Sequence, residues 1–113
     1  MDLAEDHHLV IDPYLLDIVI RNLLRNAISY GTPEQPIRIR TTSDALTVSN
    51  YGSPLDISEG KLFERFYRNH KQRASLGLGL SLVKKICDIN NLQIDYQYND
   101  GQHLFTIRVQ PNQ

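Results

Sequence analysis

The first regular pattern along the chain is a series of apolar residues at helical spacing. They recur every three or four positions, as they do on one face of a helix. They are Leu16, Val19, Ile20, Leu23, Leu24, Ala27 and Ile28. Asp12 followed by Pro13 is a typical helix start, and Gly31 is a typical helix end. The pattern therefore predicts a helix over residues 13–30 with this apolar stripe in the core.

Alternating apolar and polar residues predict four strands arranged in two hairpins. The strands are expected at residues 37–42, 45–49, 92–98 and 104–109. Asn99-Asp100-Gly101 is a strong hairpin turn signal between the last two strands. Residues 50–54 are expected to form a loop, and residues 9–11 a short apolar strand or entry segment.

Two more helices are expected in the second half of the chain. Residues 58–68 indicate a short helix with its apolar contacts at Leu62, Phe63, Phe66 and Tyr67. Residues 80–90 form an amphipathic pattern whose core stripe is Leu82, Val83, Ile86, Cys87 and Ile89. Residues 69–76 are polar and basic without periodicity, which is typical of a mobile loop. The predicted fold is an α+β two-layer sandwich, a mixed sheet with about three helices on one face.

Length and composition narrow the class of protein. A chain of 113 residues forms one domain, expected at residues 9–111 after a frayed terminus at residues 1–8. The net charge of −1 gives no bulk electrostatic case for binding nucleic acid or an anionic membrane. The single cysteine excludes an intramolecular disulfide. No apolar run is long enough to span a bilayer and no signal peptide is visible, which fits a cytoplasmic domain, including one cut from a membrane-anchored protein.

Three short polar or glycine-containing motifs are candidates for chemistry. Asn22 and Asn26 lie one helical turn apart on the border of the apolar stripe, where amide oxygens can bind a hard cation. Asn50-Tyr51-Gly52 follows a strand, and Gly77-Leu78-Gly79-Leu80 opens a helix. Taken singly, the asparagine pair fits surface decoration equally well, Asn50-Tyr51-Gly52 fits a plain turn better than a ligand site, and a Gly-x-Gly before a helix is weak evidence for a site.

Together, and in this order, the three motifs resemble the N box, G1 box and G2 box of the catalytic, ATP-binding domain of two-component sensor histidine kinases. Residues 63–68 closely resemble the F box of the same family. The resemblance covers residues 10–111. It implies the Bergerat-type ATP-binding fold that histidine kinases share with Hsp90-like chaperones, MutL-type proteins and type II topoisomerases.

The resemblance implies that ATP and Mg²⁺ are the ligands. Asn26 would supply an oxygen to Mg²⁺, with Asn22 as a further candidate ligand, and Arg25, Arg65 and Arg68 would position phosphate. The full implied set of nucleotide-binding residues is Asn22, Arg25, Asn26, Tyr30, Asn50, Gly52, Leu55, Arg68, Lys71, Gly77, Leu78, Gly79 and Leu80. No single residue is assigned as the catalyst. The ATP-hydrolysing branches typically have Glu where this chain has Asn22, and an amide cannot act as a general base.

Five positions depart from the family pattern. They are Ser29 in place of a frequent Lys, Asn50 in place of Asp, Pro54 and Ser75 in place of glycines, and His103 in a segment that often carries Gly-Thr. Asn50 can accept a hydrogen bond from adenine but can also turn over to suit guanine. The departures leave open a degenerate domain that binds nucleotide weakly and docks a partner.

The resemblance also implies a reaction and the protein partners that take part in it. The chain would transfer the γ-phosphoryl of ATP to a histidine on a separate dimerisation domain, for relay to the receiver domain of a response regulator. His7, His8 and His70 do not lie in the His-Glu context of a phosphoacceptor. The chain alone is therefore expected to be monomeric, to make no direct membrane contact and not to autophosphorylate. An anti-sigma-factor-type serine kinase is the alternative enzyme.

Overall fold

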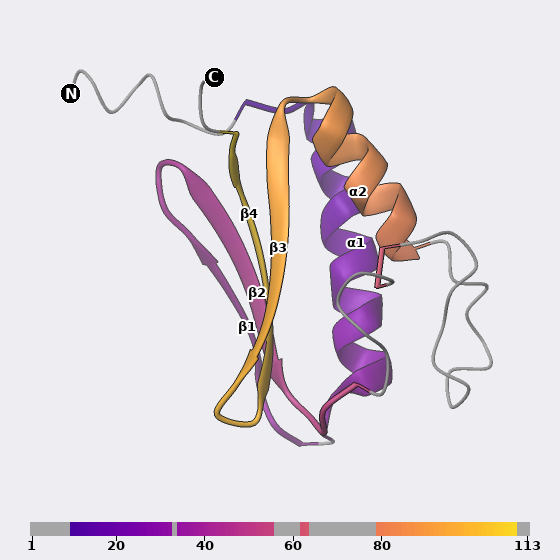
Figure 1. Ribbon diagram of the computed structural model, residues 1–113, viewed down its shortest axis with the longest axis vertical. Coiled ribbons are helices and arrows are strands. Elements are labelled where there is room, and N and C mark those ends of the chain that lie inside the picture. Colours follow the sequence, from indigo (N-terminus) through magenta and orange to yellow (C-terminus); the bar gives the residue numbers. More distant parts are fainter. Residues whose placement is uncertain (1–9, 33, 56–61, 64–78, 111–113) are drawn as a thin grey trace.

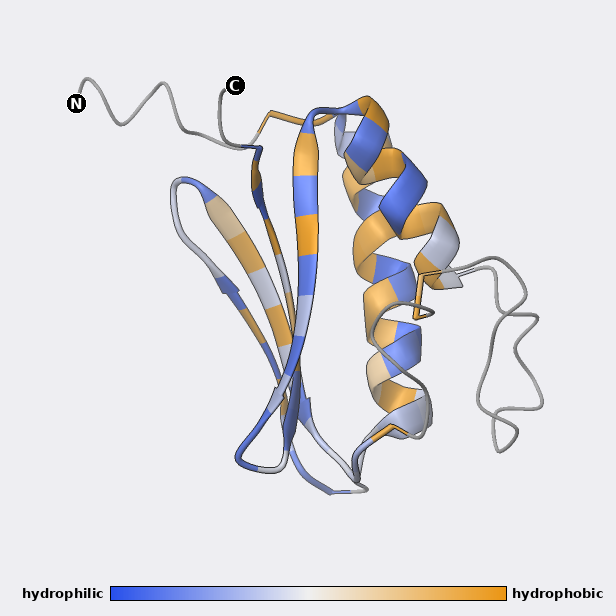
Figure 2. Ribbon diagram, in the orientation of Figure 1, coloured by the Kyte–Doolittle hydropathy of each residue, from blue (hydrophilic) through white to orange (hydrophobic). Residues whose placement is uncertain are grey.

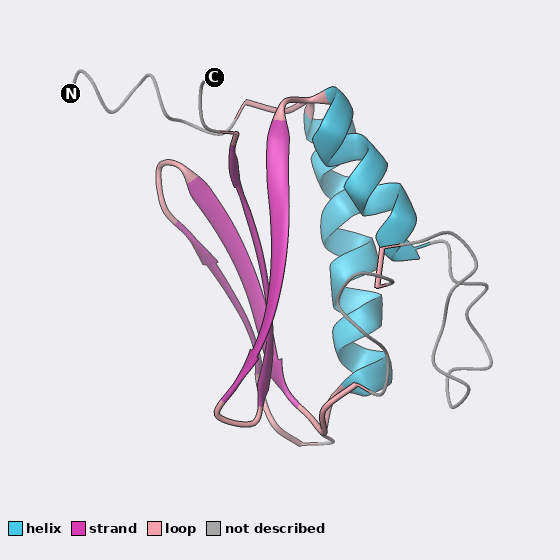
Figure 3. Cartoon of the chain, in the orientation of Figure 1, coloured by secondary structure: helices cyan, strands magenta, loops and turns pink. Residues whose placement is uncertain are grey.

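The computed structural model describes residues 10–32, 34–55, 62–63 and 79–110, which form a layer of two helices against a layer of four strands (Figure 1; Figure 3). The elements are α1 (Pro13–Tyr30), β1 (Ile37–Thr41), β2 (Ala45–Tyr51), α2 (Gly79–Ile89), β3 (Leu92–Asn99) and β4 (Gln102–Val109). The α+β two-layer fold predicted from the sequence is confirmed. Most of the short helix expected at residues 58–68 lies outside the described residues.

Helix α1 begins and ends where its sequence predicts. The side chain of Asp12 accepts a hydrogen bond from the Tyr14 backbone N–H at 2.7 Å, which satisfies one of the free donors of the first turn. Pro13 occupies the first turn, where its missing N–H costs no hydrogen bond. Gly31 follows the last helical residue in an extended conformation and turns the chain toward β1.

The strand order in the sheet is β1-β2-β4-β3, and every pair of neighbouring strands is antiparallel. This differs from the expected mixed sheet. Short turns join β1 to β2 and β3 to β4, and strands joined by such turns are necessarily antiparallel. Val10 and Ile11, expected as a strand or an entry segment, lie in no strand.

The core lies between the two layers. Helix α1 packs against β2 and α2, and α2 packs against β3. Alternating hydrophobic and hydrophilic residues along β3 place one side of that strand toward the helices (Figure 2). The buried residues are Val19, Leu23, Ala27, Leu46, Val48, Leu62, Val83, Ile86, Cys87, Leu92, Ile94, Phe105 and Ile107. The predicted apolar contacts at Leu62 and Phe63 are confirmed, and the Phe63 ring meets the Phe105 ring edge-on at 6.3 Å.

Cys87 is a core residue without the character of a reactive thiol. It is 1% exposed. Burial, with a smaller contribution from Asp88, raises the pKa of the Cys87 thiol to about 11. The thiol therefore stays protonated at neutral pH, and its role is packing.

Several apolar residues predicted for the core are exposed. Ile28 is 71% exposed, Leu82 43% and Ile89 65%. Each of these residues lies one or two positions away from a buried residue in the sequence. Successive residues of a helix are rotated by about 100°, so these side chains point away from the narrow face that meets the sheet or the other helix. The apolar stripes of α1 and α2 are therefore wider than the surfaces that the fold buries.

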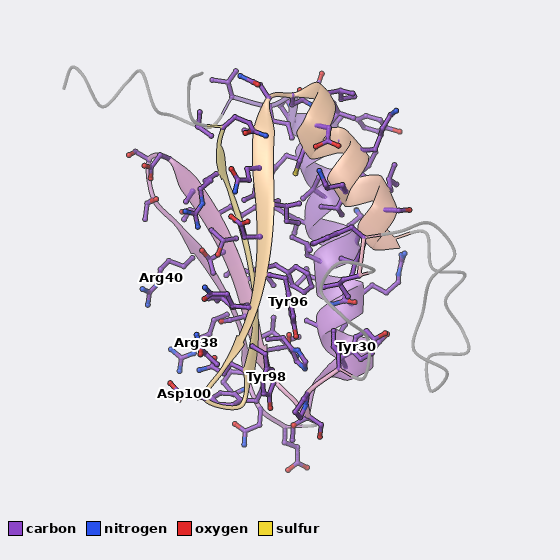
Figure 4. The ribbon with its side chains drawn as sticks, in the orientation of Figure 1. Tyr30, Arg38, Arg40, Tyr96, Tyr98 and Asp100 are labelled. Atoms are coloured by element: carbon purple, nitrogen blue, oxygen red, sulfur yellow. The ribbon has the colours of Figure 1, made fainter. Side chains whose placement is uncertain are left out.

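The edge strand and the strand ends also differ from expectation. β1 was expected to bury one face, but Ile39 is 47% exposed because β1 lies at the edge of the sheet beyond β2. Arg38 and Arg40 project from the other face of β1, away from the helices (Figure 4). Residues 50 and 51 continue β2 instead of starting the loop, and β4 begins at Gln102, so His103 is a strand residue.

The difference between buried and exposed positions of α1 predicts a difference in stability. Leu23→Ala removes a side chain that is 1% exposed and should lower the free energy of unfolding by about 2–5 kcal/mol. Ile28→Ala is the matched control on the same helix and should change it by less than about 0.5 kcal/mol. Urea denaturation followed by circular dichroism measures both. Equal losses in the two variants would contradict the assignment of the buried face.

Candidate functional site

One end of the candidate site is formed by two asparagines of α1. Asn22 and Asn26 are both half-buried, in agreement with their predicted place on the border of the stripe. The amide Nδ2 of Asn22 donates to the Ile18 carbonyl at 2.8 Å, which fixes the side chain. A Cβ placed on Gly79 would lie 3.0 Å from Asn22 Oδ1. The oxygen of Asn22 therefore faces the start of α2.

The start of α2 suits an anion. Gly79 is the first residue of an 11-residue helix, whose first backbone N–H groups have no partner within the helix. Gly79 carries no side chain that would fill the space beside Asn22. Leu80 is half-buried and packs against the core, which holds this end of α2 in place. The arrangement brings an amide oxygen and a helix N-terminus close together.

The donor set fits a Mg²⁺ ion shared with phosphate oxygens. Mg²⁺ keeps several waters and takes one or two protein ligands together with phosphates. In the described part of the chain, no three His, Cys, Asp or Glu side chains gather as they would in an all-protein metal cage. An amide oxygen beside a helix N-terminus matches a Mg²⁺ site that is completed by phosphate oxygens, and it does not match an all-protein cage. Arg25, on the same helix, is exposed.

The other end of the candidate site is formed by the last residues of β2. Asn50 is 3% exposed, and its Nδ2 donates to the backbone carbonyl of Tyr51 at 3.1 Å. Its Oδ1 has no hydrogen bond within the part of the chain that the structure describes. Asn50 therefore presents an acceptor whose orientation is set by the bond that its amide nitrogen makes.

Gly52 is held between α1 and the β3–β4 turn. Its N–H donates to the Gly101 carbonyl at 3.0 Å, and its carbonyl accepts from the Tyr98 hydroxyl at 2.8 Å. A Cβ on Gly52 would lie 2.4 Å from the Tyr30 carbonyl oxygen, closer than a side chain allows. The Thr32 N–H donates to the Tyr51 carbonyl at 2.8 Å and fastens the end of α1 to β2. These contacts fix the loop through its backbone.

His103 lies directly across the sheet from Asn50, in the register of β2 with β4. It is 1% exposed, and its Nδ1 is 2.7 Å from the Tyr96 hydroxyl. Three tyrosine rings surround it, with ring centroids 6.3 Å (Tyr30), 6.0 Å (Tyr96) and 5.0 Å (Tyr98) away. Tyr30 comes from the end of α1, and the other two come from β3 (Figure 4).

The imidazole of His103 is neutral at physiological pH. Burial lowers its pKa from the ordinary 6.5, and the main chain of Ser53 opposes this shift only in part. Its Nε2 is buried without a hydrogen bond of good geometry in the described part of the chain, and the main chain of Ser53 is the polar group that acts on the ring.

The structure brings together some of the residues that were predicted to bind nucleotide. Asn22 and Gly79 meet at one end, and Tyr30, Asn50 and Gly52 meet at the other. Leu55 is half-buried against the core. Of the departures from the family pattern, Ser29 and Pro54 are exposed, whereas Asn50 and His103 are buried. The predicted residues that lie outside the described part are Arg65, Arg68, Lys71, Ser75, Gly77 and Leu78.

His103 was not predicted as a site residue. The sequence does contain a signal for its direction, because His103, Phe105 and Ile107 alternate along one strand and therefore share a face. Its proximity to Asn50 depends on the pairing of β2 with β4, which joins strands separated by a helix in the sequence.

The lowered pKa of His103 predicts a pH-dependent stability. The unfolded chain binds a proton at His103 near the ordinary pKa of 6.5, whereas the folded domain binds it only at a lower pH. The free energy of unfolding should therefore decrease as the pH falls from 6.5 through the lowered pKa. The slope for one proton is at most about 1.4 kcal/mol per pH unit. Urea denaturation between pH 7.5 and pH 5 should show a smaller loss in His103→Leu than in the unsubstituted chain. The same loss in both would contradict the burial of a neutral imidazole.

Comparison with known proteins places the chain in a family. Residues 11–113 match the family described as histidine kinase-, DNA gyrase B-, and HSP90-like ATPase. The heme sensor protein HssS of Staphylococcus aureus (strains JH9 and Newman) is 36% identical over 104 residues, which cover 87% of this chain and 23% of HssS. The chain thus spans about a quarter of the length of these curated relatives.

Solved structures agree with this match. A nucleotide-free form of the catalytic domain of histidine kinase ThkA is 27% identical, with a TM-score of 0.68 over 88% of this chain and 69% of that one. Acinetobacter baumannii histidine kinase AdeS is 25% identical, with a TM-score of 0.67 over 90% of this chain and 48% of that one. Within the described residues, neither helix has both the length and the apolar character of a membrane span. The chain therefore belongs to the family of histidine kinase-, DNA gyrase B- and HSP90-like ATPases, and within it resembles the catalytic domains of histidine kinases.

Proposed function

We propose that this domain binds Mg²⁺-ATP as the catalytic domain of a sensor histidine kinase. The observation that carries the proposal is the meeting of Asn22 Oδ1 with the N-terminal end of α2 at Gly79, in a chain of this ATPase family. An amide oxygen beside free backbone N–H groups suits a phosphate chain with its cation. Asn50 and Gly52, at the other end, are the proposed base-binding residues.

The proposed division of labour follows from the two ends of the site. Asn50 and the Gly52 backbone orient the base, and Asn22 with Asn26 and the start of α2 hold the phosphates and Mg²⁺. Bound Mg²⁺ would neutralise charge on the phosphates. Positioning and charge neutralisation are the main protein contributions to phosphoryl transfer. Arg25 is the described residue proposed to position phosphate, and Arg65, Arg68 and Lys71 are proposed for the same task.

The side chain at position 22 favours transfer of the γ-phosphoryl group to another protein group over hydrolysis of ATP by water. A general base for water must accept a proton, and the amide of Asn22 cannot do so. Its Nδ2 is also engaged with the Ile18 carbonyl at 2.8 Å, so the side chain is held as an oxygen ligand. We propose that the acceptor is a histidine on a separate dimerisation domain and that the phosphoryl group passes on to a response regulator.

The names of the relatives support this reading. HssS is a heme sensor protein, and ThkA and AdeS are histidine kinases. The match to HssS covers 23% of that protein, so the sensing of heme that its name describes is not carried over to this chain. The signal that a longer protein would detect is therefore not part of this proposal. ATP-dependent phosphorelay of this kind places the domain in the cytoplasm.

Calorimetric titration with ATP, with and without Mg²⁺, tests the nucleotide site. The unsubstituted domain should bind ATP more tightly with Mg²⁺ than without it. Asn26→Ala should remove most of this Mg²⁺-dependent gain, weakening Mg²⁺-ATP binding by about tenfold or more, because one protein ligand of the cation is lost. Gln97→Ala, which removes an exposed amide from β3, is the matched control and should bind like the unsubstituted domain.

Two results would overturn the assignment. If the folded domain fails to bind ATP at millimolar concentration, the proposed function is wrong, and a degenerate domain that docks a partner becomes the better interpretation. If ATP binds and Asn26→Ala retains the full effect of Mg²⁺ while its thermal unfolding is unchanged, the role of Asn26 is wrong and the nucleotide site stands.

A further inference from the structure

Strand β1 leaves one edge of the sheet without a partner. It stands first in the order β1-β2-β4-β3, so no strand in the described part of the chain pairs with its outer edge (Figure 1). Its pairing with β2 is regular over all five residues of the strand, without a bulge. A regular edge strand presents a row of backbone N–H and C=O groups with which an extended segment can pair.

The turn between β1 and β2 determines which residues face this edge. The Thr42 N–H donates to the Ala45 carbonyl at 2.9 Å, so these two residues form a hydrogen-bonded pair. Hydrogen-bonded and non-hydrogen-bonded pairs alternate along an antiparallel ladder. Arg40 therefore points its backbone groups toward β2, whereas Ile39 and Thr41 point theirs toward the open edge.

The two faces of β1 carry side chains of different kinds. On the face away from the helices, Arg38 and Arg40 are exposed (Figure 4). Within the described residues, neither takes part in an ion pair. On the helix side, Ile39 is 47% exposed, because no described helix or strand covers it. The edge therefore has two cations on one face and an uncovered apolar side chain on the other.

The opposite edge of the sheet, at β3, lacks these features. Asp95 on its outer face lies 3.7 Å from Arg108 of β4, so the two charges balance each other. Helix α2 packs against β3. Of the two edges, β1 is the one with unbalanced charge and uncovered apolar surface.

The arginines argue against a second copy of the chain as the occupant of this edge. In an antiparallel pairing of β1 with β1 of another molecule, opposed residues share a face, so Arg38 would lie opposite Arg40 or opposite Arg38 of that molecule. Like charges that are directly opposed destabilise a sheet, and charged edge strands prevent self-pairing in this way. A strand with carboxylates at the matching positions is attracted by the same charges.

We propose that β1 is a docking edge for an extended, antiparallel segment of a partner protein in which acidic and apolar residues alternate. The carboxylates lie opposite Arg38 and Arg40, and the apolar residues lie on the helix side next to Ile39. The alternation follows from the two faces of β1, since successive side chains of a strand point to opposite faces. The inference uses none of the residues proposed to bind nucleotide and does not rest on that function.

Titration with synthetic peptides tests the docking edge. A fluorescein-labelled peptide in which glutamate and valine alternate over about seven residues should bind the unsubstituted domain, as measured by fluorescence anisotropy. The valines share a face with Ile39, so their N–H groups point toward β1. N-methylation of the valines should therefore remove binding, whereas N-methylation of the glutamates, whose N–H groups point away, should leave it intact. Equal affinity of the two methylated peptides would indicate attraction by charge alone and would overturn the proposal.

Variants of β1 locate the site on the domain. Arg40→Glu should weaken binding of the peptide about threefold to tenfold, and Arg21→Glu, at an exposed arginine of α1, is the matched control and should not. Thr41→Pro removes an outward N–H without removing a hydrogen bond to β2, and should weaken binding by a similar factor. Thr41→Val keeps this N–H and should bind like the unsubstituted domain. Equal affinity of the proline and valine variants would contradict the pairing.

Hydrogen exchange on the unsubstituted domain decides the matter if Thr41→Pro does not fold. The peptide should slow exchange of the Ile39 and Thr41 amides and leave that of Asp95 on the other edge strand unchanged. Absence of this protection, or no binding at about 1 mM peptide, would overturn the proposal.

Two other occupants of the edge have outcomes of their own. If the domain dimerises without peptide and its Ile39 and Thr41 amides are then protected, a second copy is the occupant and the proposal is wrong. If an oligothymidylate of the same charge binds as tightly as the peptide, the arginines bind anions without strand pairing, which also contradicts it. Neither result bears on the proposed nucleotide site, which the titration with ATP decides separately.

Discussion

The antiparallel pairing of β2 with β4 is the constraint on which the rest of the molecule depends. It opposes Val48 to Phe105, which are core residues, and in the same register it opposes Asn50 to His103. If β4 slipped by one residue against β2, Phe105 and His103 would turn to the solvent face of the sheet and would no longer oppose Val48 and Asn50. The register that builds the core therefore also sets the positions of Asn50 and His103, at the end of β2 where the base is proposed to bind.

Helix α1 joins the two ends of the site in a similar way. Its buried side anchors it on the sheet, its polar side carries Asn22 and Asn26, and its last carbonyl lies against Gly52. The bond from the Thr32 N–H to the Tyr51 carbonyl fixes the end of the helix to the end of β2. The distance between the proposed phosphate-binding and base-binding residues is thus set by the length of one helix.

Much of this fold follows from local sequence, and the errors have a common cause. Asp12 and Pro13 fix the start of α1, and Asn99-Asp100-Gly101 fixes the last hairpin, because caps and turns depend on neighbouring residues alone. Ile28 was placed in the core because it fits the apolar period, yet it is 71% exposed, and Ile39 in the predicted strand at residues 37–42 is 47% exposed. Burial depends on which element covers a residue, and no described helix or strand covers these positions on the edge strand and on the flank of the helix. The site follows the same rule: the asparagines of α1 were found from their spacing, whereas His103 depends on a strand pairing between distant segments.

The positions of Asn50 and His103 change the meaning of two departures from the family pattern. Taken separately, an amide in place of a carboxylate and a histidine near a missing threonine suggest a site in decay. Their opposition across the sheet makes them physically dependent on each other. A carboxylate at position 50, in register with His103, would favour the charged imidazolium form of that ring. The neutral amide of Asn50 adds no such charge, which agrees with the lowered pKa of His103. The two departures therefore belong to one pair of opposed strand residues, and their effect on the proposed nucleotide site has to be considered together instead of one residue at a time.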